Sequence, residues 1–323
     1  MVVLEALKGG SKFPFDMLKC ERESVVGYWD WWWEGRDMGV LDRPYTISDS
    51  DPILRPTDSK ETIDTNGDYD HFDDVFQKLL SDGILPRGRA ISRTAYRSAV
   101  VDYLCGLAPQ LPEPLVIFMG GGYGAGKTST IKYLSSSGVL PGRLPQCALH
   151  GVDYCKQVLP EFNLVKSVSD GRASEICQNE SRLISDTLFA TLISEKRSFV
   201  WDSSMSDYEK TLPKLDYAKK NEYQVGMFGV LTDLEVAKRR AMKRACDTGR
   251  FAHPGYLEGS HRKFWSNLDQ YVRYPFDFLY ILENSIDLDT PENQPIIALK
   301  QPEDSEVQFI DSDTYRSYTS NPS

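Results

Sequence analysis

The segment GGYGAGKT, residues 121–128, constrains the fold of this chain more than any other feature. It fills every defined position of the pattern G-x-x-x-x-G-K-[ST], whose glycines let successive backbone N–H groups turn toward phosphate oxygens. An apolar run, Leu115 to Met119, ends directly before it, and the residues from Thr128 onward read as a helix start, which favours negative charge. The alternative is a glycine-rich turn that includes Lys and Thr by chance, and such a turn would not require a strand before it and a helix after it. The pattern predicts a nucleoside triphosphate site formed by Gly121, Gly122, Tyr123, Gly124, Ala125, Gly126, Lys127, Thr128 and Ser129.

Two side chains of this segment have specific expected roles. Lys127 reaches the β- and γ-phosphates, and the hydroxyl of Thr128 ligates Mg²⁺. The motif does not indicate whether the triphosphate is hydrolysed, acts as a switch or donates a phosphoryl group to a small molecule. Ligands of open α/β sheets lie at the carboxyl ends of the strands, so the residues that follow the other strands discriminate among these uses.

Short apolar runs alternate with longer amphipathic stretches after residue 113, and this alternation predicts the fold class. Strands that alternate with helices imply right-handed crossovers and a parallel sheet. We therefore predict an α/β P-loop fold with a parallel, five-stranded, nucleoside-kinase-like sheet covered by helices on both faces. The predicted strands are 114–120, 147–153, 198–202, 224–231 and 278–284, and one clear helical stretch between them is 174–196.

The composition changes near residue 75, which suggests a domain boundary. Residues 36–70 are rich in Asp, Ser, Thr and Pro and read as loop. The Trp-rich segment YWDWWWEGRD (28–37) before them is a hydrophobic plug against the main domain or, alternatively, a platform for ligand stacking. We expect an N-terminal extension over 1–74 and a P-loop domain over 75–323, with leading helices in 75–110 and a core over 113–323. Ser92 is the expected N-cap of the second leading helix.

Charge and cysteine content exclude some classes of function. The 37 Lys and Arg residues against 47 Asp and Glu residues give a net charge of −10, which argues against an extended nucleic-acid surface but allows a small anionic substrate. Six cysteines without a CxxC pair suggest free thiols in a reducing compartment. Neither the cysteines nor the four histidines show metal-binding spacing. No apolar run is long enough for a signal peptide or a membrane span, so we expect a cytoplasmic protein without a membrane partner.

Acidic residues follow two of the predicted strands. Asp153 comes after the second run, where a carboxylate could accept a proton from an acceptor hydroxyl or could instead cap the next helix. Asp202 ends the third run and is expected to hold Mg²⁺ with Thr128.

A basic stretch follows the fourth predicted strand. Arg240 and Arg244 are four residues apart on one helix face, and Arg250 follows Gly249. These arginines form a lid over the transferring phosphoryl group or, alternatively, a solvated basic face.

Four segments together resemble the zeta toxin family of P-loop kinases: GGGYGAGKTST, GVDYCKQVLPEF, ESRLISDTLFATLISEKRSFVWDSSMSD and LEVAKRRAMKRACDTGRFAHP, within residues 75–311. The resemblance implies ATP-dependent phosphoryl transfer to a hydroxyl of a small acceptor, such as a nucleotide sugar, and allows an inhibitory protein partner. It implies catalytic roles for Asp153 as general base and for Lys127, Arg244 and Arg250, with Arg240 binding the nucleotide. For the acceptor it implies Lys156, Ser204 and an acidic residue, for which Glu180 and Asp186 are both candidates.

The chain departs from the family pattern at Ser206, where sugar-nucleotide kinases of the family carry an arginine. Without that charge, the resemblance does not point to UDP-N-acetylglucosamine itself. Two alternatives remain open at this stage. One is a nucleotide-binding regulator without transfer activity, and the other is a kinase for a nucleotide or a polynucleotide end, of which the acidic charge disfavours the polynucleotide form.

Overall fold

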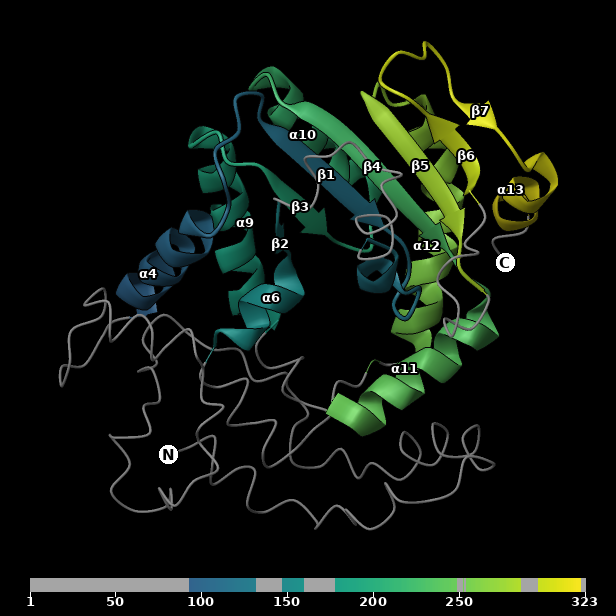
Figure 1. Ribbon diagram of the computed structural model, residues 1–323. Coiled ribbons are helices and arrows are strands. Elements are labelled where there is room, and N and C mark those ends of the chain that lie inside the picture. Colours follow the sequence, from purple (N-terminus) through teal and green to yellow (C-terminus); the bar gives the residue numbers. More distant parts are fainter. Residues whose placement is uncertain are drawn as a thin grey trace, which may run out of the picture. The chain divides into compact units, whose positions relative to one another are not determined.

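All five predicted strands are present in the computed structural model, which describes residues 93–131, 147–159, 178–248, 252, 254–285 and 296–320. They are β1 (Leu115–Gly120), β2 (Ala148–His150), β3 (Phe199–Asp202), β4 (Gln224–Leu231) and β5 (Phe278–Glu283). Every pair of neighbours among them is parallel, in the order β2-β3-β1-β4-β5 (Figure 1). The prediction of a five-stranded parallel sheet is confirmed for this part of the structure.

Two further strands extend the sheet beyond the five that the sequence indicated. β6 (Ile296–Lys300) pairs antiparallel with β5, and β7 (Gln308–Phe309) pairs antiparallel with β6, which makes the sheet seven-stranded in the described residues. The sequence analysis missed them because β7 has only two residues and β6 is buried at only two positions, Ile297 and Ala298. Neither strand is buried along its whole length, the arrangement that gives the long continuous apolar run of a strand buried on both faces.

The described helices agree with the predicted pattern where the two can be compared. α4 (Arg93–Gly106) is the second leading helix, and α9 (Gln178–Ser194) lies within the predicted stretch 174–196. Ser92, the first leading helix and the extension 1–74 lie outside the described residues. The remaining helices are α6 (Val152–Gln157), α10 (Tyr208–Lys220), α11 (Leu234–Thr248), α12 (Pro254–Arg273) and α13 (Ser312–Thr319).

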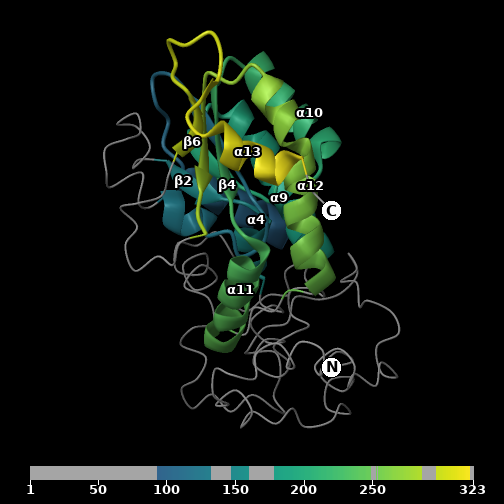
Figure 2. The ribbon, with the colours of Figure 1, turned by 90° about the vertical axis from the view of Figure 1, so that its right-hand side faces the viewer.

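The core lies on both sides of the central strands β1 and β4, which are buried along almost their whole length. Leucine, isoleucine, methionine and aromatic side chains of these strands and of β5 pack in one cluster, which includes Leu115, Ile117, Met119, Phe228 and Tyr280. Helices α10 and α12 lie on one side of the sheet in Figure 2. That helices also cover the opposite face of the sheet remains a prediction from the sequence.

The chain divides into two compact units. The larger contains the whole sheet, the phosphate loop, α10, α12 and α13, and comprises Val101–Val152, Ser185–Ala241 and Ala252–Ser323. The smaller comprises Met1–Val100, Asp153–Ile184 and Met242–Phe251. Most of the predicted nucleotide-binding residues therefore belong to the larger unit, whereas Asp153, Lys156 and Glu180 belong to the smaller one.

Candidate active site

The loop after β1 has the backbone geometry of a phosphate cradle. Its helix begins at Lys127, and Thr130 N–H donates to the carbonyl of Gly126 at 2.9 Å. Gly124 has a φ of +82°, a conformation that costs an L-residue free energy. A Cβ at this position would lie 2.6 Å from the carbonyl oxygen of Ala237 in α11. Gly124 is one of the variable positions of the motif, but the tertiary structure requires glycine there.

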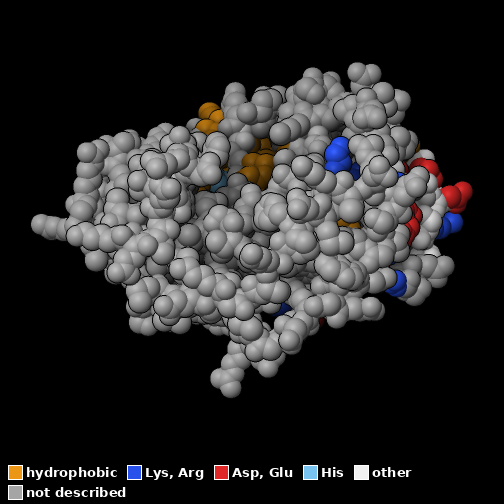
Figure 3. All heavy atoms as spheres, turned by 90° about the horizontal axis from the view of Figure 1, so that it is seen from below, with side chains coloured by type: hydrophobic (Ala, Val, Ile, Leu, Met, Phe, Trp, Pro, Cys, Tyr) orange, Lys and Arg blue, Asp and Glu red, His pale blue; other side chains and the backbone are white. Residues whose placement is uncertain are grey.

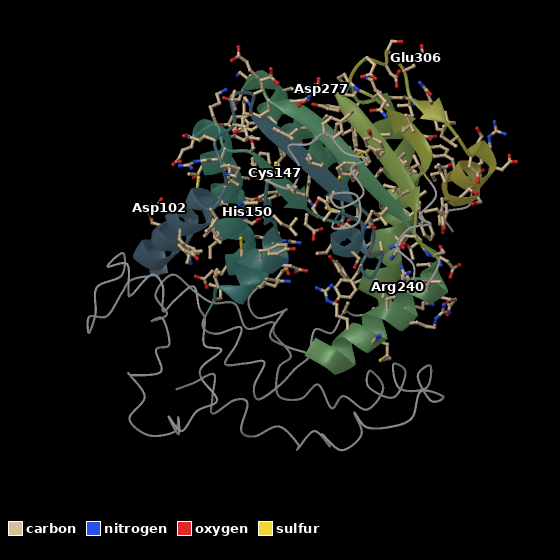
Figure 4. All side chains as sticks on the ribbon, viewed as in Figure 1. Asp102, Cys147, His150, Arg240, Asp277 and Glu306 are labelled. Carbon is tan, nitrogen blue, oxygen red and sulfur yellow. The ribbon has the colours of Figure 1, made fainter. Side chains whose placement is uncertain are left out.

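Two buried side chains, just after the ends of β4 and β5, form hydrogen bonds to the backbone of the phosphate loop. The carbonyl of Ala125 accepts a hydrogen bond from Thr232 Oγ1 at 3.1 Å and from Asn284 Nδ2 at 2.7 Å. Arg240 Nη1 in turn donates to the carbonyl of Asn284 at 2.6 Å. Arg240 of α11, labelled in Figure 4, is therefore linked to the phosphate loop through one residue. Sequence reasoning missed Thr232 and Asn284, although their positions just after strands were a usable signal.

Lys127 and Asp202 lie side by side at the mouth of the loop. Lys127 Nζ donates to the carbonyl of Gly121 at 3.0 Å and lies 3.7 Å from Asp202 Oδ1. Strand pairing causes this, because Asp202 is the register partner of Met119, two residues before the loop. The structure thus brings together two residues that the sequence analysis assigned to phosphate and metal binding.

The donor atoms near Lys127 suit a magnesium ion. Mg²⁺ prefers oxygen ligands and commonly binds one or two protein side chains together with substrate phosphates. Asp202 offers a partly exposed carboxylate and Thr128 a partly exposed hydroxyl on the first turn of the helix. In the described part of the chain, no group of three or more His, Cys, Asp or Glu side chains is arranged to hold a metal ion.

The segment after β3 is fixed against the start of the phosphate loop. Gly121 N–H donates to the carbonyl of Ser204 at 3.1 Å. Met205 has a left-handed φ of +48°, and Tyr271 Oη donates to its carbonyl at 2.8 Å. Ser204 Oγ and Ser206 Oγ are 2.8 Å apart and share a hydrogen bond. The anchored segment presents two neutral hydroxyls beside the loop, one of them from the predicted acceptor residue Ser204.

Asp153 lies in the first turn of α6. The helix begins at Val152, directly after Gly151, so Asp153 lies inside its first turn and not before it. A Cβ on Gly151 would lie 2.3 Å from the carbonyl oxygen of Asp202, so glycine is needed where β2 ends beside β3. Within the smaller unit, Lys156 Nζ lies 3.3 Å from Asp153 Oδ1, and the Asp153 side chain is 42% exposed. The carboxylate is accessible to a substrate and has a neighbouring cation.

The two acidic candidates on α9 have different environments. The Glu180 side chain is 1% exposed, and its Oε1 accepts a hydrogen bond from Arg97 Nε of α4 at 3.0 Å. The Asp186 side chain is 65% exposed and pairs with Lys214 of α10 at 2.7 Å. Glu180 is thus held in a fixed ion pair, whereas Asp186 belongs to an open surface pair. Arg97 was not identified from the sequence.

The basic stretch in α11 is neutralised in part by acidic neighbours. Lys238 Nζ lies 2.9 Å from carboxylate oxygens of both Glu235 and Glu258. Figure 3 shows acidic and basic side chains of the described residues together at one edge of that view. Arg244 follows Arg240 by one turn in α11, and Arg250 lies outside the described residues. Lys238 is thus paired with two carboxylates, and the choice between a lid and a solvated basic face for the arginines stays a prediction.

Three cysteine side chains among the described residues, Cys105, Cys147 and Cys155, are free thiols. His150, labelled in Figure 4 at the end of β2, is buried, and burial lowers its pKa to about 4. No helix in the described ranges is both long and apolar enough to cross a membrane.

The amino-acid sequence matches the model of a known protein family. The sequence model described as Zeta toxin matches residues 102–286, more than half of the chain. No curated protein matches the chain significantly.

Several solved structures have a similar fold, although their sequences have low identity to this chain. The crystal structure of AvrRxo1-ORF1:-ORF2 with ATP has a TM-score of 0.55 at 17% identity, with 71% of this chain and 73% of that chain covered. The structure from the PezAT chromosomal toxin-antitoxin system of Streptococcus pneumoniae has a TM-score of 0.52 at 13% identity, with 72% of this chain and 89% of that chain covered. At these identities the likeness shows the fold.

Proposed function

The chain belongs to the zeta toxin family of kinase-like, ATP-binding phosphotransferases, and on this premise we propose that it transfers the γ-phosphoryl group of ATP to a hydroxyl of a small acceptor. The observation that carries the proposal is the cradle after β1, with Lys127 Nζ 3.0 Å from the Gly121 carbonyl and 3.7 Å from Asp202. The structure crystallised with ATP has this same fold, which supports ATP as the phosphoryl donor.

In the proposed reaction, residues 121–129 bind the triphosphate through backbone N–H groups, and Lys127 exchanges its bonds to loop carbonyls for phosphate oxygens. Thr128 and Asp202 would hold Mg²⁺, which when bound neutralises charge on the phosphates. Arg240, Arg244 and Arg250 are the proposed arginines that stabilise charge on the transferring group. Arg240 is supported by its 2.6 Å bond to the Asn284 carbonyl, because that bond connects it to the loop.

Asp153 is the proposed general base. It would accept the proton of the acceptor hydroxyl as the oxygen attacks the γ-phosphorus, and the bond to the β,γ-bridging oxygen of ATP breaks. The partial exposure of its side chain supports this role. Lys156 Nζ, 3.3 Å from Asp153 Oδ1, places a positive charge beside the carboxylate.

The proposed acceptor contacts are Lys156, Ser204 and one of the two acidic residues of α9. Glu180 is fixed by its ion pair with Arg97 but is only 1% exposed, whereas Asp186 is 65% exposed and accessible to a substrate. The neutral pair Ser204–Ser206 suits a hydroxyl-bearing part of the acceptor. A nucleotide sugar or a related metabolite is the proposed acceptor class.

Mass spectrometry tests the proposal directly. Purified protein, Mg²⁺ and ATP are incubated with a metabolite extract spiked with nucleotide sugars, next to Lys127→Ala and Asp153→Asn. We expect a metabolite that gains one phosphoryl group with the wild type alone, while Asp153→Asn still binds ATP within about threefold of wild type, because loss of the base affects transfer and not binding. If Asp153→Asn transfers at the wild-type rate, the base assignment is wrong. ATP binding without any phosphorylated product would favour a nucleotide-binding regulator.

An inhibitory protein partner is part of the proposal. It is supported by the structural similarity to a chain from a toxin-antitoxin system and to the AvrRxo1-ORF1:-ORF2 complex. Growth of cells that express the wild-type chain, compared with cells that express Lys127→Ala, tests the need for an inhibitor. Growth arrest with the wild type alone is the expected result, and equal growth would remove the reason for an inhibitor.

A further inference from the structure

Two consecutive residues of α12 bind the main chain of Tyr123, in the middle of the phosphate loop. Tyr123 N–H donates to Ser260 Oγ at 3.0 Å, and the carbonyl of Tyr123 lies 2.9 Å from His261 Nε2. Ser260 and His261 are both buried. Because they contact the peptide groups on both sides of one Cα, they fix the backbone direction of the loop at that point.

The surroundings of His261 determine which ring nitrogen carries hydrogen. A carbonyl oxygen only accepts, so Nε2 must donate to Tyr123. The ring is fully buried, and burial lowers the pKa of His261 to about 4, so the imidazole is neutral near pH 7 and Nδ1 carries no hydrogen. Nδ1 has no hydrogen-bond partner among the described residues. A buried acceptor without a partner costs free energy, so among the two ring nitrogens only Nε2, through Tyr123, forms a stabilising hydrogen bond to the described residues.

The ring is also confined sterically. A Cβ on Gly122 would lie 2.1 Å from the His261 ring, so the loop can approach α12 this closely only because residue 122 is glycine. On its other side the ring contacts Trp265, with ring centroids 5.5 Å apart. The imidazole therefore has one orientation, in which Nε2 faces Tyr123.

This arrangement directs a backbone donor of the loop. In a planar trans peptide the C=O and N–H groups point in opposite directions. The carbonyl of Tyr123 points toward α12, so the N–H of Gly124, in the same peptide group, points away from α12. A phosphate-binding loop depends on the directions of its backbone N–H groups.

We propose that Ser260 and His261 are positioning residues for the nucleotide, and that their bonds to Tyr123 keep the Gly124 N–H directed at a phosphate oxygen. The proposal rests on the proposed binding of ATP by the loop and does not depend on the acceptor. In this role the two side chains of α12 fix the backbone of the phosphate loop and do not themselves contact the substrate.

Calorimetric binding of Mg-ATP and of Mg-tripolyphosphate to the full chain tests the proposal. His261→Phe keeps a ring but removes the donor, and His261→Gln keeps an N–H donor at a similar distance. Ser260→Ala removes the acceptor for Tyr123 N–H and an intrahelical bond to the Leu257 carbonyl at 2.7 Å. Ser266→Ala is the matched control, since Ser266 Oγ makes only the equivalent intrahelical bond, to Lys263 at 3.0 Å.

We expect His261→Phe to weaken both ligands by about tenfold or more and by similar factors, because the loss falls on phosphate contacts, the size expected for one charge-assisted hydrogen bond. His261→Gln should stay within about threefold of wild type, Ser260→Ala should weaken both ligands several-fold, and Ser266→Ala should leave binding unchanged. In turnover assays the KM for ATP should rise with little change in the KM for the acceptor.

Folded His261→Phe with wild-type affinity, or His261→Gln as weak as His261→Phe, would overturn the proposal. If His261→Phe does not fold, Ser260→Ala against Ser266→Ala decides: equal affinities for these two refute a positioning role. A wild type that binds ATP but phosphorylates no acceptor refutes the proposed transfer and leaves the binding comparison valid, so the two proposals fail separately.

Discussion

Replacement of Gly124 by alanine tests the description of the phosphate loop most directly. The backbone at this position has a φ of +82°, which costs an L-residue about 1–2 kcal/mol. The new Cβ would lie 2.6 Å from the carbonyl oxygen of Ala237, an atom of the α11 backbone that no side-chain rotation can move. Overpacking of this kind adds about 1–3 kcal/mol. Gly124→Ala should therefore lower the free energy of unfolding by about 2–5 kcal/mol.

Gly259→Ala is the matched control for this substitution. Gly259 lies inside α12, and a Cβ there has no heavy atom within 4 Å. Alanine is a better helix former than glycine, so this variant should raise the free energy of unfolding by about 1 kcal/mol.

Urea unfolding of the two variants and the wild type measures these differences, and ATP titration measures the effect on the loop. Gly124→Ala should also bind ATP at least tenfold more weakly, because the loop or α11 must move to admit the methyl group. A Gly124→Ala variant within about 0.5 kcal/mol of wild type, with normal ATP affinity, would refute the left-handed conformation and the close approach of Ala237.

Three further predictions concern other parts of the larger unit. Asp202→Asn should lower phosphoryl transfer at least tenfold and raise the Mg²⁺ concentration needed for half-maximal rate, because an amide is a weaker magnesium ligand; an unchanged Mg²⁺ titration would exclude Asp202 as a ligand. Tyr223→Phe should cost about 1–3 kcal/mol in urea unfolding, because the buried Tyr223 hydroxyl bonds the carbonyls of Leu192 and Arg197, each at 2.9 Å, at the end of α9. Burial lowers the pKa of His150 to about 4, so between about pH 6.5 and 4 this histidine binds a proton in the unfolded chain and not in the folded chain, and its contribution to stability should fall by up to roughly 3 kcal/mol as the pH decreases through this window. His150→Phe should reduce the pH dependence of unfolding by about this amount and leave the similar contribution of His261, and an equally steep dependence in the variant would contradict the assignment.

The environments of Glu180 and Asp186 show the limit of the sequence pattern. Both are acidic residues on one predicted helix, six positions apart, and the pattern offers no criterion for choosing between them. The contact with Arg97 of α4, 83 residues earlier in the chain, distinguishes Glu180. Only the packing of α4 against α9 could reveal that contact. The Trp-rich segment and Arg250 lie outside the described residues, so their predicted roles stay predictions.

The phosphate loop, the five parallel strands and the acidic residues that follow them could be predicted from the amino-acid sequence. These features are local, because a motif, a run of apolar residues or a strand end is encoded within a few neighbouring positions. Burial on both faces makes the central strands β1 and β4 continuous apolar runs, and this made them predictable.

The distant residues that complete the site could be identified only from the three-dimensional arrangement of the strands and helices. Asp202 meets Lys127 because β3 is the neighbour of β1 in the sheet, although β2 precedes it in the chain. Asn284 and His261 contact the loop from 159 and 138 residues away from their partners. Crossover connections bring the carboxyl ends of parallel strands to one edge of the sheet regardless of their separation in the chain. Hydrogen bonds across such distances depend on the order of the strands, and no local pattern of residues encodes that order.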